Sequence, residues 1–150
     1  MPLIRLESKE NQVISSSHIL NEKEIQKIRY IIIADGCLKK IDLSFSLSQS
    51  CQFHISFSCI AKNKGSIQIF LKNDVSSHSP HCVLSQTVNG IVLDSSSIQV
   101  TPVMNIATSK INASHSIHIG RVEKDKIFYL MNKGFCKEEA ISLLIKSLVE

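Results

Sequence analysis

The sequence predicts a mainly β protein in which a β-solenoid is followed by a pair of α-helices. Segments of strictly alternating apolar and polar residues, such as Leu43–Leu47 and Phe53–Phe57, recur between residues 29 and 120. This alternation places one set of side chains inside and the other outside, as in a β-strand. After residue 120 the apolar residues recur instead with the spacing of an amphipathic helix.

A β-sandwich or a barrel would also produce many short strands, but two features favour the solenoid. Serine occupies many positions that alternate with the apolar residues, and small polar side chains suit the outer face of stacked coils. The chain has no Trp, whereas a sandwich more often has longer strands and a large aromatic anchor in its core. Turn-forming clusters separate the expected strands, among them Asp35-Gly36, Asn63-Lys64-Gly65, Asn73-Asp74 and Asn89-Gly90.

The chain divides into three segments of a single domain. We expect residues 1–20 to be a loosely held leader with at most one strand near Leu3–Leu6, and residues 21–120 to be the β-helix core. Residues 121–150 are expected to form a helical appendix, with helices at Glu123–Asn132 and about Lys137–Val149. Gly134 should end the first helix because Gly suits the left-handed position after a helix. The appendix is expected to cap the β body or to offer a docking surface.

Composition argues against several classes of partner. The net charge is +4 and the basic residues are scattered rather than clustered on one face, so we expect no nucleic-acid partner. No apolar run approaches the ~18 residues of a membrane-spanning helix, so we expect no membrane partner. Five cysteines without a CxxC pair, and without a secretory signal before them, indicate free thiols in a reducing compartment. We therefore expect a cytoplasmic protein.

No motif predicts an enzyme. The chain has only 5 Gly, none of them in a GxxxxGK phosphate loop, and it lacks a GxSxG nucleophile elbow. Its acidic residues lie mainly in expected turns and helix starts, without a defensible pair for acid and base catalysis. We expect a binding or scaffold protein without catalytic residues.

The densest group of potential metal ligands is the stretch His78-Ser79-Pro80-His81-Cys82. Imidazole and thiolate together suit zinc or iron. The group is a weak candidate because only His78, His81 and Cys82 are local ligands.

His115 is a second candidate, because a neutral imidazole can ligate iron or carry a proton near neutral pH. It alternates in phase with Ile117 and Ile119, so it can equally be a partly buried histidine with a local hydrogen bond. His118 has the opposite phase and should face outward.

The sequence after Lys110 resembles a known family. Residues 114–135 read SHSIHIGRVEKDKIFYLMNKGF, and Lys137-Glu138-Glu139-Ala140 follows. This run is similar to the C-terminal signature of the SufB/SufD family: a Ser-His pair, a short strand, Gly-Arg, an acidic helix start, Phe-Tyr-Leu, and Gly before an apolar residue. The resemblance covers about Arg29 to Glu150. It implies a right-handed parallel β-helix flanked by helices, with a part in iron–sulfur cluster assembly beside SufB and the ATPase SufC.

Within that family the chain resembles SufD more than SufB. His115 falls where SufD members carry a histidine implicated in cluster assembly, which makes it the cluster-assembly candidate. The chain has Ala113 where SufD can carry cysteine, and Val88 where the scaffold cysteine of SufB aligns. These differences imply that no cofactor is bound stably, and that iron or an iron–sulfur cluster is held only transiently.

The resemblance also implies partners. Family members contact SufC through their C-terminal helices, a role that falls here on Phe128, Tyr129, Leu130, Gly134 and Phe135, unless these residues only pack the helices onto the last coil. The implied partners are a SufC-like ATPase, a SufB-like protein and a second copy bound through the β-helix as a homodimer. The alternative function is a stand-alone β-solenoid that serves structure or self-association without cluster chemistry.

Overall fold

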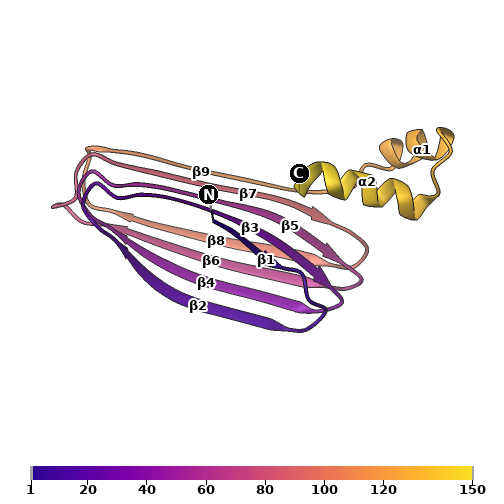
Figure 1. The fold of residues 1–150 in the computed structure, drawn as a ribbon, viewed down its shortest axis with the longest axis horizontal. Coiled ribbons are helices and arrows are strands. Elements are labelled where there is room, and N and C mark those ends of the chain that lie inside the picture. The colour runs from indigo at the N-terminus through magenta and orange to yellow at the C-terminus, as the bar shows by residue number, and fades with distance from the viewer. Residues whose placement is uncertain (1, 150) are drawn as a thin grey trace.

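The computed structural model describes residues 2–149, apart from the side chains of residues 148 and 149. Met1 and Glu150, at the ends of the expected leader and appendix, lie outside this part of the chain. The described part has nine strands followed by two helices (Figure 1). No helix within it is long and apolar enough to cross a membrane. The elements are β1 (Leu3–Leu6), β2 (Gln12–Leu20), β3 (Ile25–Asp35), β4 (Leu38–Leu47), β5 (Gln52–Lys62), β6 (Ser66–Val75), β7 (Cys82–Val92), β8 (Ser97–Ile106), β9 (Ile111–Arg121), α1 (Lys124–Asn132) and α2 (Lys137–Val149).

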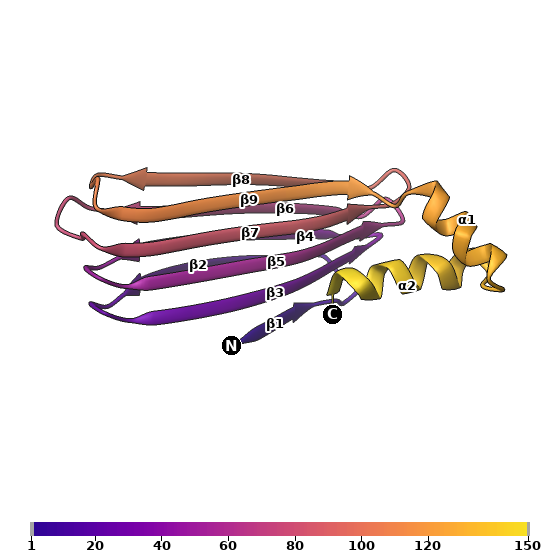
Figure 2. The same ribbon diagram turned by 90° about the horizontal axis from the view of Figure 1, so that it is seen from above.

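Successive strands alternate between two sheets. One sheet has the order β1-β3-β5-β7-β9 and the other has the order β2-β4-β6-β8. All neighbouring strands are parallel. Leu3 lies opposite Arg29 and Ser66 lies opposite Ser97, so one coil takes 26 to 31 residues. Figure 2 shows the coils stacked along one axis, with the helices at one end of the strands. The predicted parallel β-helix with a helix pair is confirmed.

The strands send alternate side chains into the interior, as the sequence pattern predicts. In β7 every second residue from Cys82 to Val92 is buried. Because neighbouring strands are in register, inward residues of successive coils form continuous rows. One such row consists of Tyr30, Phe57, Val88 and Ile117. The rings of Tyr30 and Phe57 stack with their centres 4.9 Å apart. Side chains within a row thus make direct contacts between successive coils.

Residues 1–20 differ from the loosely held leader that we expected. β2 pairs with β4 along its whole length, and the Ser15-Ser16-Ser17 run lies within it. Ser15 and Ser17 are exposed, while Ser16 is half-buried. Serine has little intrinsic preference for strands, but pairing with a neighbouring strand overrides this preference. Together, β1 and β2 form a coil of the solenoid.

Two clusters that we expected to be turns lie inside strands. Asn73-Asp74 belongs to β6 and Asn89-Gly90 belongs to β7. A Cβ atom at Gly90 would lie 2.9 Å from Ile98 Cδ1, so this glycine provides room for a side chain across the interior rather than a turn. At both sites the pairing of the coils overrides the local turn preference.

A buried lysine connects the first coil to the second. Lys39 is fully buried, and its ammonium group donates to Ser8 O and Glu10 O at 2.7 Å each. Ser8 Oγ lies at 3.1 Å and Gln12 Oε1 at 2.5 Å from the same Nζ atom. A buried charge is tolerated only with such partners. The β1–β2 loop is therefore folded around the Lys39 side chain.

The helix pair leaves the solenoid after β9, and α2 returns along its outer surface (Figure 2). Gly134 has a φ of +102°, so α1 ends through the left-handed residue that was predicted. Ile31 and Ile60 point to the outer face of the β1–β9 sheet and are buried, yet they lie outside the interior cluster. α2 contacts β5 and buries Ala140 completely. We infer that α2 covers this outer patch.

We expect Gly65→Ala to destabilise the solenoid. A Cβ atom at Gly65 would lie 2.0 Å from Ala34 O in the neighbouring coil. Overpacking against backbone of this kind should lower the free energy of unfolding by about 3 kcal/mol in chemical denaturation. Gly120→Ala is the control, because a Cβ atom there meets nothing within 4 Å. Equal stabilities of the two variants would contradict the steric explanation.

Candidate functional site

The last coil exposes side chains of the kind that the other coils bury. β8 and β9 are the outermost strands of their sheets, so no further strand covers their inward rows within the described chain. Ile106, Ile117 and Ile119 are 38%, 36% and 39% exposed. Unpaired N–H and C=O groups along an outermost strand are also free to pair with another chain. We call these inward rows and strand edges of β8 and β9 the end-coil surface.

His115 lies on the end-coil surface, in the middle of β9. It stands opposite Gln86 of β7, on the inward face of its strand. Its side chain is exposed and makes no hydrogen bond within the described structure, so the local hydrogen bond of a corner histidine is absent. His118 stands opposite the outward-facing Asn89, as predicted, and its Nε2 atom lies 2.9 Å from Ser116 Oγ. The imidazole of His115 is therefore accessible to a metal ion or a partner.

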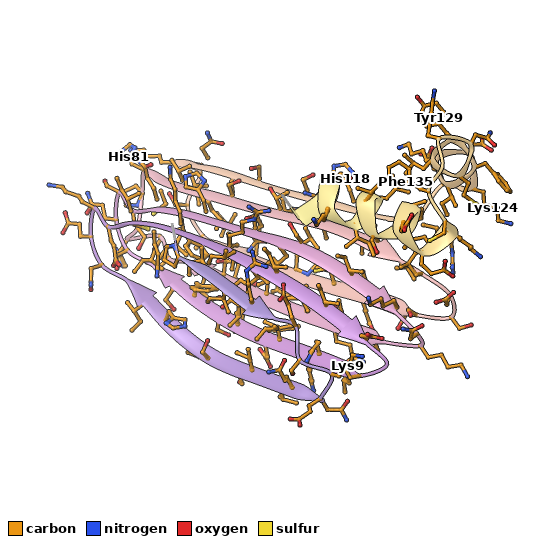
Figure 3. All side chains as sticks on the ribbon, turned by 45° about the vertical axis from the view of Figure 1, so that its right-hand side comes forward. Lys9, His81, His118, Lys124, Tyr129 and Phe135 are labelled. Carbon is orange, nitrogen blue, oxygen red and sulfur yellow. The ribbon has the colours of Figure 1, made fainter. Side chains whose placement is uncertain are left out.

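The helix pair presents a second exposed apolar surface. Phe128, Tyr129 and Phe135 are 60%, 61% and 39% exposed. Figure 3 shows Tyr129 on α1 and Phe135 in the connection between the two helices, at the opposite end of the molecule from His81. The ammonium of Lys133 lies 5.4 Å from the centre of the Tyr129 ring. We call the exposed apolar residues of the two helices and their connection the helix-pair surface; its members are Phe128, Tyr129, Met131, Phe135 and Leu143.

The two remaining predicted partner residues shape this surface rather than lie on it. Leu130 is half-buried and lines a shallow groove between the helices with Leu144. Gly134 forms the turn after α1, where its N–H donates to Met131 O at 3.1 Å. The structure thus leaves Phe128, Tyr129 and Phe135 exposed and places Leu130, half-buried, in the groove between the helices.

The weak metal candidate is not brought together. Cys82 begins β7 with its side chain inward, where its Sγ atom donates to Ser48 O at 2.9 Å and lies 3.7 Å from Cys51 Sγ. His78 and His81 are exposed on the turn before it. No group of three or more His, Cys, Asp or Glu residues that could hold a metal ion occurs in the described part of the chain. The thiol of Cys82 points into the interior, whereas the two imidazoles are exposed on the turn.

Sequence reasoning missed one polar residue beneath His115. Gln86 is 2% exposed, and neither polar atom of its side chain has a hydrogen-bond partner in the described structure. The available signal was its position between Leu84 and Val88, which have the same inward phase. A polar residue at an inward position is a better indicator of a special role than an exposed one.

The fold defines a class of protein: a parallel β-solenoid with an exposed end coil and an exposed apolar helix pair. The family described as SUF system FeS cluster assembly, SufBD core domain, matches residues 40–148, from β4 to α2. The match includes β9 with His115, both helices and most of the coils. The chain belongs to this family.

Archaeal relatives carry the same family description. The iron–sulfur cluster assembly SufBD family protein of Methanothermobacter thermautotrophicus is 26% identical over 87 residues, which are 57% of this chain and 21% of the relative. Such a protein from Archaeoglobus fulgidus is 32% identical over 62 residues, 41% of this chain and 17% of the relative. One from Pyrococcus horikoshii is 32% identical over 59 residues, which are 39% of this chain and 18% of the relative. The matched part of the chain thus spans about a fifth of each relative.

The buried thiols should resist alkylation in the native protein. All five cysteines are free, and Cys136 is exposed whereas the others are buried. Burial raises the pKa of Cys51 and of Cys59 to about 12, and the thiolate is the reactive form. Mass spectrometry after treatment with iodoacetamide at about pH 8 should therefore find Cys136 modified and Cys51 and Cys59 unmodified. Denatured protein, the control, should be modified at all of them; native modification of Cys59 as fast as of Cys136 would contradict this.

Proposed function

We propose that this chain acts in iron–sulfur cluster assembly as a SufD-type partner without enzymatic activity of its own. In this proposal a SufC-type ATPase binds the helix-pair surface, and a SufB-like protein binds the end-coil surface. His115 takes part in cluster assembly where the SufB-like protein meets the end-coil surface. The observation that carries the proposal is the exposure of both surfaces in one chain, with His115 on one of them. Family membership supports the iron–sulfur role.

The helix-pair surface has the chemistry of a protein contact. Phe128 and Tyr129 are neighbours on α1, and each exposes about three-fifths of its surface, at 60% and 61%. Large aromatic side chains supply much of the binding energy where proteins meet, because they bury a large apolar area in one pocket. The helices also extend past the strands, which leaves room for a partner around them (Figure 1).

The end-coil surface suits a partner that adds a strand. β9 is an outermost strand, and extended segments of a second protein can pair with such an edge through main-chain hydrogen bonds. β8 contains Pro102, which has no N–H to donate, so the edge of β9 is better suited to pairing. A partner on β9 would cover His115 and could supply the further ligands that iron requires.

The chain alone offers few ligands for a cluster. Ala113 and Val88, at the positions where family members can carry cysteine, lie on inward rows opposite Leu84 and Ile117. We propose that iron or an iron–sulfur cluster is held only transiently, between His115 and groups of a partner. ATP hydrolysis would belong to the SufC-type protein. The free thiols agree with the reducing cytoplasm that we expect as its location.

A stand-alone solenoid that self-associates is the second candidate function. The exposed apolar residues Ile106, Ile117 and Ile119 favour it, because two end-coil surfaces placed together would bury them. Such a homodimer needs neither His115 nor the helix-pair surface. Variants in those two features therefore separate the two functions.

Phe128→Glu should weaken binding to a SufC-type ATPase by about tenfold or more. Removing an aromatic anchor commonly costs about 2 kcal/mol in binding, and a charge opposes burial of the site. Isothermal titration calorimetry measures the affinity. Phe70→Glu is the matched control, because Phe70 is also exposed (38%) but lies on β6 in the other sheet. The docking assignment is wrong if both variants bind as tightly as the unaltered chain.

His115→Ala should lower the iron and sulfide retained after anaerobic reconstitution with a SufB-like partner, because an imidazole ligand is lost. We expect the content to fall to the level of that partner alone, measured by iron and sulfide assays. His118→Ala is the control, since His118 lies on the same strand with the opposite phase. Normal cluster content and normal complementation in cells for His115→Ala, with light scattering showing a dimer, would favour the self-association function.

A further inference from the structure

A buried glutamine in β7 has no hydrogen-bond partner. Gln86 is 2% exposed, and within the described structure neither Nε2 nor Oε1 makes a hydrogen bond. A buried carboxamide without a partner costs free energy, and such groups are uncommon in folded proteins. Leucine would fill the same space at a lower cost. The position is thus better explained by a polar group that reaches Gln86 than by packing.

The register leaves Gln86 with a single polar neighbour in its own row. It lies opposite Ile55 of β5 on one side and opposite His115 of β9 on the other. His115 has the same phase as Ile111 and Ala113, which pack against the interior. Adjacent strands lie about 4.8 Å apart, so rotation about the side-chain bonds of His115 can bring its imidazole to the Gln86 carboxamide.

We propose that Gln86 is a positioning residue for His115, whose carboxamide hydrogen-bonds one imidazole nitrogen and selects its tautomer. A neutral imidazole has one donor and one acceptor nitrogen, and a carboxamide can serve either. The hydrogen bond to the second nitrogen orients a histidine that binds metal or moves a proton. The free nitrogen of His115 then faces the partner. The inference rests on the role proposed for His115, although the contact can be tested without that role.

Asn73 is the competing partner for Gln86. It is fully buried in β6, and both polar atoms of its side chain also lack partners within the described structure. Its own row neighbours are Phe45 and Met104, which offer it no amide or imidazole. A contact between the two buried amides across the interior would satisfy both without His115. The experiment therefore changes each amide in turn.

The tautomer of His115 provides the readout. Long-range ¹H–¹⁵N NMR of the full chain, at a pH where the imidazoles are neutral, measures the Nδ1–H and Nε2–H populations of each histidine. Gln86→Leu should change the ratio for His115 by about twofold or more, because even a weak hydrogen bond shifts an equilibrium by that factor. The ratio for His118 should not change in Gln86→Leu, and Asn73→Leu should leave both ratios unchanged. Leucine removes an unpartnered amide without creating another, so both variants should fold, which thermal unfolding verifies.

Two results would overturn the inference. The first is a change below about twofold for His115 in Gln86→Leu, which is less than one hydrogen bond should cause. The second is an equal change in Asn73→Leu, which would show that the His115 ratio responds to the loss of any interior amide rather than to a hydrogen bond from Gln86. The measurement needs neither iron nor a partner protein. It can therefore fail while His115 still functions in cluster assembly, and it can succeed even if His115→Ala assembles clusters normally.

Discussion

Register between the coils is the constraint on which the rest of the structure depends. In a solenoid, the environment of a residue is set by the coils before and after it rather than by its neighbours in sequence. Phe57 is 1% exposed because Tyr30 and Val88 cover it from the two adjacent coils. Ile117 continues the same row in the last coil of the described chain, and it is 36% exposed. The end-coil surface is thus the interior of the solenoid continued to its boundary.

Alternation in the sequence was sufficient to predict strands such as β4 and β5 and which of their side chains face inward, but not β2 or the places where strands continue through polar residues. Asn89-Gly90 looks like a turn locally, yet its place within β7 depends on Ile98, which approaches the glycine from β8. Ser15-Ser16-Ser17 looks like part of a leader, yet it pairs with Asp42-Leu43-Ser44 in the next coil. In both cases the deciding contact lies in another strand, so no local pattern reveals it.

In the candidate site, too, residues within a continuous sequence pattern could be predicted, whereas residues defined by distant contacts could not. His115 and the aromatic residues of α1 were predictable, because they lie within one continuous stretch that resembles a family signature. Lys39 and Gln86 were not predicted as special, because their surroundings come from distant residues. The Lys39 ammonium is held by Ser8, which is 31 positions away in the sequence. Cys82 and His81 do not form a site, because Cys82 points into the interior at the start of β7 whereas His81 is exposed on the turn before it, where its φ is +62°.

The return of α2 onto the sheet changes how this solenoid can come apart. A stack in which each coil touches only its neighbours tends to fray from its ends, one coil at a time. Here α2, the second helix after β9, contacts β5, which lies two strands from β9 in the sheet order. The contact between α2 and β5 therefore links the terminal coil to the middle of the stack. Force applied through the helices would therefore act on β5 as well as on the last strand. The outermost coil would stay folded until the contact between α2 and β5 was broken.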